Sequence, residues 1–226
     1  MAWPRRLPLP PAIWLAVAMA LATTACAGDQ GREANGYTPD PQALQALEEG
    51  VRLQELGNLQ AAFEAFGRAL QRDRRLAEAY ARRGYIYLAY GNTDRAETAI
   101  ESALRADPQL ALAYVYQGLL LERKGRGTDA LLSLTRAIQL DPDLAEAYFH
   151  RARLRAQGGD PSAALEDLSR LVELEPGEAL YYMERARLYL LLEDVDRAVA
   201  DLEQVLALSQ DETLTTAAKA LLARLR

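Results

Sequence analysis

A period of 34 residues constrains this chain of 226 residues more than any other feature of its sequence. The period is carried by tetrapeptides that start at Ala77, Ala111, Ala145 and Ala179 and end at Tyr80, Tyr114, Tyr148 and Tyr182. Pro108, Pro142 and Pro176 keep the same step. A fixed period of this length indicates one supersecondary unit used repeatedly, with each copy burying its apolar face on its neighbours.

Each unit is predicted to be a pair of amphipathic helices. In residues 77–110, Tyr80, Gly84 and Tyr87 recur at helical spacing, so they share one face of a first helix. The pair Gly91-Asn92 breaks that helix, and Asn92 can cap the next one. Asp107-Pro108 ends the second helix, because the residue before proline is disfavoured in helical geometry.

These units resemble tetratricopeptide repeats, which have an aromatic residue, a small residue, alanines and a proline at fixed places. The resemblance covers residues 43–212 and gives units at 43–76, 77–110, 111–144, 145–178 and 179–212. It implies an all-α fold, a right-handed α-α superhelix of five helix-turn-helix repeats. Residues 213–226 keep helical spacing and are predicted to be a capping helix over the last repeat.

Two positions of the repeat carry further predictions. A small residue stands where paired helices should approach most closely, at Gly50, Gly84, Gly118, Ala152 and Ala186. The preceding position, usually leucine in the family, holds Arg83, Arg151 and Arg185 in three units. We expect the stems of these arginines to cover apolar surface while their charged heads stay in water. Glu193 stands where earlier units have the turn glycine.

The amino end is predicted to be a secretory leader. Residues 1–25 contain Arg5 and Arg6 followed by an apolar segment at 12–21, which is too short to span a bilayer. Ala25-Cys26 resembles a bacterial lipobox, although Thr23 departs from the usual aliphatic residue. The resemblance implies lipidation of Cys26. The alternative is ordinary cleavage after Ala27, which would release a soluble protein.

Residues 26–42 are polar and rich in turn formers, and we expect them to be a flexible tether. With Ala27 after the cysteine, the resemblance implies an exported protein anchored to a membrane, the outer membrane facing the periplasm in a Gram-negative cell.

Composition argues against several function classes. The formal charge is −6, and about −8 without Arg5 and Arg6, so nucleic acid is a poor partner. Cys26 is the only cysteine and His150 the only histidine, which disfavours a metal site. We find no nucleophile motif and no phosphate-binding loop, and we expect no catalytic residues, metal or cofactor.

Binding is expected in a concave groove lined by the first helices, as the resemblance implies. The groove positions carried over from the family are Leu47, Val51, Arg82, Tyr85, Leu88, Val115, Tyr116, Leu119, Arg123, Phe149, His150, Arg153, Met183, Arg187 and Leu190. The aromatic residues among them should make the tightest contacts. Glutamates on or beside the same surface make its charge mixed, and any one aromatic residue is as apt to pack inside the fold as to touch a partner.

The leading hypothesis is therefore a non-enzymatic scaffold, lipid-anchored in the cell envelope, which binds an envelope protein. It resembles lipoproteins of pilus or secretion machines and of peptidoglycan-enzyme complexes only through its plan of anchor plus repeats. The alternatives are a soluble exported protein that self-associates and, much less favoured, a small enzyme. Oligomeric state and partner identity stay open.

Overall fold

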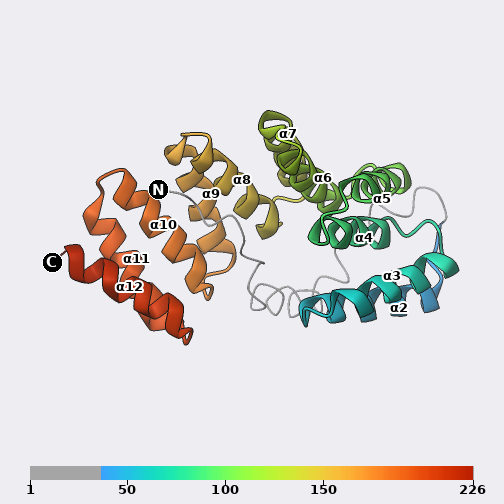
Figure 1. Cartoon of the computed structure of the whole chain (residues 1–226), viewed down its shortest axis with the longest axis horizontal. Helices are drawn as coiled ribbons and strands as arrows, with labels where there is room; N and C mark the ends of the chain where they lie inside the picture. The colour runs from blue at the N-terminus through green and yellow to red at the C-terminus, as the bar shows by residue number, and fades with distance from the viewer. Residues whose placement is uncertain (1–36, 226) are drawn as a thin grey trace. The chain divides into compact units, whose positions relative to one another are not determined.

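The computed structural model describes residues 37–225, which form eleven α-helices and no strands (Figure 1). The chain divides into two compact units between Arg126 and Gly127. Unit 1 contains α2 (Pro41–Glu55), α3 (Leu59–Arg72), α4 (Ala77–Ala89), α5 (Thr93–Ala106) and α6 (Ala111–Arg123). Unit 2 contains α7 (Gly127–Leu140), α8 (Ala145–Gln157), α9 (Pro161–Leu174), α10 (Ala179–Leu191), α11 (Val195–Leu208) and α12 (Glu212–Leu225). The all-α repeat fold is confirmed.

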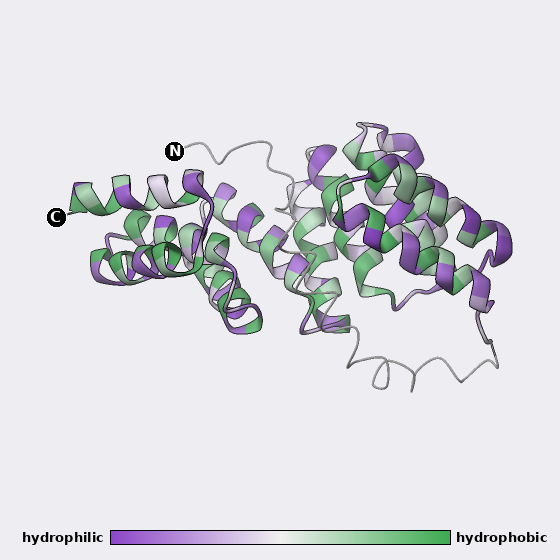
Figure 2. Ribbon diagram, turned by 90° about the horizontal axis from the view of Figure 1, so that it is seen from below, coloured by the Kyte–Doolittle hydropathy of each residue, from purple (hydrophilic) through white to green (hydrophobic). Residues whose placement is uncertain are grey.

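Helices that follow one another in the chain pack together within each unit. In unit 1 α2 packs on α3 and α4 on α5, and in unit 2 α8 packs on α9 and α10 on α11. Hydrophobic and hydrophilic residues alternate along every helix (Figure 2), as expected of helices with one buried side. Phe66 and Ile86 lie in the core of unit 1, and Met183 and Leu202 in the core of unit 2.

The turn between α4 and α5 is built as the sequence predicts. Gly91 has φ +77°, and the side chain of Asn92 accepts a hydrogen bond of 3.1 Å from the backbone N–H of Arg95. Asn58, Asp160 and Asp194 cap α3, α9 and α11 in the same way. Glu193 takes the glycine's place with φ +62°, a backbone region that costs a residue with a Cβ roughly 1–2 kcal/mol.

Small residues stand at the closest approach of paired helices, also as predicted. A Cβ added to Gly50 would lie 2.4 Å from Cε1 of Phe66, and one on Gly84 would lie 2.7 Å from Cγ1 of Ile100. Both distances are far below van der Waals contact. Ala152 and Ala186 hold the same position in unit 2 and are buried.

The periodic tyrosines join consecutive helix pairs. The hydroxyl of Tyr148 donates a hydrogen bond of 3.1 Å to the backbone carbonyl of Pro142, six residues earlier. The same bond recurs from Tyr114 to Pro108 and from Tyr182 to Pro176. The two regular series in the sequence are thus partners in one contact, which explains why they share a period.

The prediction for the arginines that replace leucine is wrong. The guanidinium of Arg151 donates to both carboxylate oxygens of Asp167, at 3.0 and 2.7 Å, and Arg185 does the same to Asp201 at 2.8 and 2.7 Å. Both aspartates are buried. Arg83 places its guanidinium 4.2 Å above the ring of Phe63. The heads leave water because they meet partners on neighbouring helices: an aspartate on the paired helix for Arg151 and Arg185, and an aromatic ring on α3 for Arg83.

The two ends of the described chain are fastened differently. The expected tether reached residue 42, yet the hydroxyl of Tyr37 donates to the carboxylate of Asp73, and α2 already begins at Pro41. The guanidinium of Arg75 lies 3.8 Å from the centre of the Tyr37 ring. At the other end, Ala218 and Leu222 of α12 share a core cluster with Met183 and Leu202. Helix α12 therefore covers the apolar side of the last pair.

Asp167→Ala should lower the free energy of unfolding by about 3 kcal/mol, because it leaves Arg151 and Arg155 without the buried carboxylate to which both donate. Chemical denaturation followed by circular dichroism measures this. Glu166→Ala, at a more accessible position of the same helix, is the matched control and should change stability by less than about 0.5 kcal/mol. Equal stability of the two variants would show that the ion pair does not hold α8 on α9.

Candidate protein-binding faces

The predicted binding residues lie on the first helices of the pairs and fall into two sets, one in each unit. The unit 1 face is the set on α4 and α6: Arg82, Tyr85, Leu88, Val115, Tyr116, Leu119 and Arg123. The unit 2 face is the set on α8 and α10: Phe149, His150, Arg153, Met183 and Arg187. Leu47 and Val51 lie in or against the core cluster of unit 1. Leu190 is a half-buried residue of α10.

An aromatic pair lies at the centre of the unit 1 face. The rings of Tyr85 and Tyr116 are 5.2 Å apart and tilted by 33°. Tyr116 has no exposed surface, whereas Tyr85 is half-buried. Tyr85 is therefore the ring of this pair that a partner can contact, and the buried Tyr116 packs against it.

The remaining residues of the unit 1 face divide by burial. Leu88 and Val115 are buried, Leu119 is half-buried and Arg123 is exposed. Arg82 is buried too, and its Nε donates a hydrogen bond of 2.7 Å to Glu78 one helical turn earlier. This pairing reduces the charge that Arg82 offers to a partner, so Arg123 is the cation on the face with the freest access.

The unit 2 face centres on Phe149. Its ring lies 5.5 Å from that of His150 in an edge-on arrangement and 6.0 Å from that of Tyr181. Phe149 and Arg153 are half-buried, while Met183 has no exposed surface. Arg187 is exposed and donates a hydrogen bond of 2.5 Å to the buried Glu184. The face thus contains an aromatic ring and an exposed arginine, two residue types that are enriched in interaction hot spots.

Burial sets the ionisation of this face. It lowers the pKa of His150 to about 3, with a further contribution from the charge of Arg153, so the imidazole is neutral at pH 7. Its Nε2 lies 3.9 Å from a carboxylate oxygen of Glu146, which is too far for a hydrogen bond. Burial also raises the pKa of Glu184, and the neighbouring Arg187 opposes that rise. His150 is therefore a packed residue, whereas the sequence favoured a polar residue of the groove or surface over a ligand or base.

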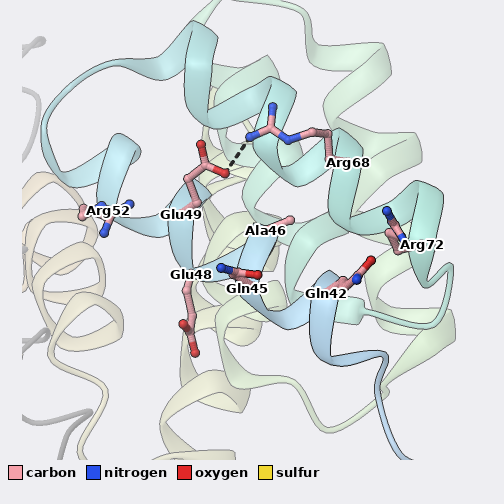
Figure 3. A pocket seen from close by; sticks show the side chains of 8 residues that line it. All are labelled: Gln42, Gln45, Ala46, Glu48, Glu49, Arg52, Arg68 and Arg72. Carbon is pink, nitrogen blue, oxygen red and sulfur yellow. Dashed lines mark hydrogen bonds and ion pairs between the residues drawn. The ribbon is translucent and has the colours of Figure 1, made fainter.

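A polar hollow of about 570 Å³ lies on the open side of α2 and α3 (Figure 3). It is lined by Gln42, Gln45, Ala46, Glu48, Glu49, Arg52, Arg68 and Arg72. Arg68 and Glu49 form an ion pair of 2.7 Å across it. This is the side on which a preceding repeat would pack, and a terminal repeat needs a polar outer face there. The hollow is therefore explained as a solvated end of unit 1.

Residues 37–225 contain neither a metal-ligand cluster nor a membrane-spanning helix. No group of three or more His, Cys, Asp or Glu side chains in this range is placed to hold a metal ion. None of the helices in the same range combines the length and apolar character needed to cross a membrane. The predicted leader and Cys26 lie outside the described residues.

Sequence reasoning missed the partners that immobilise the arginines and the amino-terminal segment. Asp167 and Asp201 each follow their arginine by 16 residues and repeat after 34, so the spacing was present in the sequence. Tyr37 and Asp73 carry no such signal, because their contact occurs once and outside the period.

Comparison with known proteins agrees with this geometry. The family model described as tetratricopeptide repeat (TPR) matches residues 47–111, 82–145 and 149–213. No curated protein matches the sequence.

Solved structures match over most of their length. A thermophilic TPR protein of Thermus thermophilus is 24% identical, with a TM-score of 0.67 over 80% of this chain and 99% of that one. YrrB, described as a TPR protein with an unusual peptide-binding site, is 25% identical, with a TM-score of 0.54 over 79% and 92%. The pilF protein of Pseudomonas aeruginosa is 19% identical, with a TM-score of 0.66 over 76% and 78%. With the family model matching well over half of its residues, the chain belongs to the tetratricopeptide repeat family.

Proposed function

We propose that this protein is an adaptor that binds segments of partner proteins on the unit 1 and unit 2 faces. The TPR fold supports a protein–protein interaction scaffold, and the family is generally non-enzymatic. The observation that carries the proposal is the composition of the two faces, each of which includes a half-buried aromatic ring and an exposed arginine: Tyr85 and Arg123 on the unit 1 face, and Phe149 and Arg187 on the unit 2 face. Rings that already pack against buried neighbours lose little conformational entropy on binding, which favours affinity.

We further propose that the partner is a protein of the cell envelope and that a lipid on Cys26 holds the adaptor at a membrane. The leader and the lipobox-like Ala25-Cys26 support this placement. Two proteins of similar structure support an envelope partner: pilF, and PilW, which is described as a widely conserved type IV pilus biogenesis factor. At 19% identity they share the fold, so the machine that this adaptor serves is the part left for experiment.

The double variant Tyr85→Ala with Phe149→Ala should capture the main partner at least tenfold more weakly, because truncating an aromatic hot spot costs about 2 kcal/mol or more. Crosslinking in native membranes, followed by quantitative mass spectrometry, measures capture. Tyr90→Ala with Leu132→Ala removes the same kind of side chain at exposed positions off both faces and should capture normally. Thermal melts of both variants show that the fold survives. A folded face variant with unchanged capture would move binding to another surface.

Cys26→Ser should shift the protein from the membrane to the soluble fraction, since the acyl chains are the proposed anchor. The intact mass of the natural product separates the two processing routes independently. Lipidation predicts a chain that begins at Cys26 and carries the mass of its acyl groups, whereas ordinary cleavage predicts an unmodified chain that begins at Gly28. Membrane retention of the serine variant would count against the lipid anchor.

A further inference from the structure

Three arginines lie within four residues of one another at the turn between α3 and α4. Arg72 is the last residue of α3, and Arg74 and Arg75 lie in the turn that follows, all three exposed or nearly so. We call these three residues the arginine corner. The whole chain is acidic, with a formal charge of −6, so a positive corner is not a consequence of overall composition.

The three arginines outnumber the one carboxylate of the corner, Asp73, so the corner has a net charge of +2. Arg72 and Arg74 form no ion pair with any residue in the described part of the chain. The one carboxylate inside the turn, Asp73, accepts hydrogen bonds from the Tyr37 hydroxyl and from the backbone N–H groups of Asp40, at 3.3 Å, and Arg75, at 2.9 Å. Arg72 and Arg74 therefore face solvent without an ion-pair partner, while Arg75 lies over the Tyr37 ring and its charge is offset by Asp73.

The repeat itself does not require these arginines. The positions 34 residues after Arg72, Arg74 and Arg75 hold Ala106, Pro108 and Gln109, and those 34 further hold Leu140, Pro142 and Asp143. The α3–α4 turn has Arg74 at the position where later turns have the proline whose carbonyl accepts the hydrogen bond of the periodic tyrosine. Packing explains the later turns, but it does not explain the charge of the first.

The corner is also where the amino-terminal segment joins the fold. Tyr37 is held there by Asp73 and Arg75. Tyr37 is eleven positions after Cys26, and a chain of that length spans at most about 40 Å even when fully extended. An anchor on Cys26 would thus keep the corner within about 40 Å of a membrane surface.

We propose that the arginine corner docks on the headgroups of anionic phospholipids. Clustered arginines next to a membrane are attracted to anionic headgroups, and a polybasic patch is the second signal that makes a lipid anchor stable. Contact through the corner would fix the orientation of unit 1, with the α3–α4 turn toward the headgroups and the α2–α3 and α4–α5 turns away from them. The inference goes beyond partner binding and concerns a different surface.

The test is flotation of the chain from residue 27 onward, which keeps every described residue and has no lipid, with vesicles that contain phosphatidylglycerol. We expect binding to these vesicles and none to vesicles of phosphatidylcholine alone. Arg72→Gln with Arg74→Gln should weaken binding about 25-fold, about fivefold for each arginine. Arg75 stays in place so that the Tyr37 contact survives.

The matched control removes two other exposed arginines, Arg136→Gln with Arg224→Gln, and should bind like the parent chain. Raising the ionic strength from about 0.1 M to about 1 M shortens the screening length from about 10 Å to about 3 Å and should release the protein. No binding to anionic vesicles, or equal binding by the corner variant and the parent, would overturn the proposal. Either result leaves partner capture by the two faces untouched, since that is measured with other variants.

Discussion

A helix of 13 or 14 residues is not stable alone, and the rest of this structure depends on how closely its partner helix can approach. Glycine at positions 50 and 84, and alanine at 152 and 186, removes the side chain that would hold the paired helices apart. Large apolar residues such as Phe66 and Ile100 then fill the space above the two glycines. Removing this contact would separate the paired helices and expose the core on which the surfaces of each unit rest.

Polar contacts that recur with the 34-residue period add to this packing. The hydroxyls of Tyr114, Tyr148 and Tyr182 donate to the proline carbonyls of the preceding turns, so three first helices are fixed to the turns that lead into them. In unit 2, Arg151 with Asp167 and Arg185 with Asp201 add ion pairs inside the helix pairs. Such pairs stabilise only while both members are present. Arg83 has Ala99 at the position of the aspartate, and its guanidinium stacks on Phe63 instead.

The sequence was sufficient for features that depend on the repeat and insufficient for those that do not. The turn at Gly91-Asn92, the small residue at Gly84 and the final helix could be predicted because propensity and period agree there. The burial of Tyr116 and Met183 could not, because helical spacing alone does not separate a presented ring from one that supports it. The contact of Tyr37 with Asp73 joins residues 36 apart that belong to no pattern.

The proposed adaptor separates its tasks in space: two faces for partners, and one corner with an anchor for the membrane. Its central claim is that partners bind on the first helices. A photo-crosslinking amino acid placed singly at Tyr85, Leu119 and Arg187, and at the off-face positions Glu64, Leu132 and Gln139, tests this in cells. The account predicts crosslinks to a common protein from the face positions alone. Crosslinks from the off-face positions, with none from the faces, would contradict it.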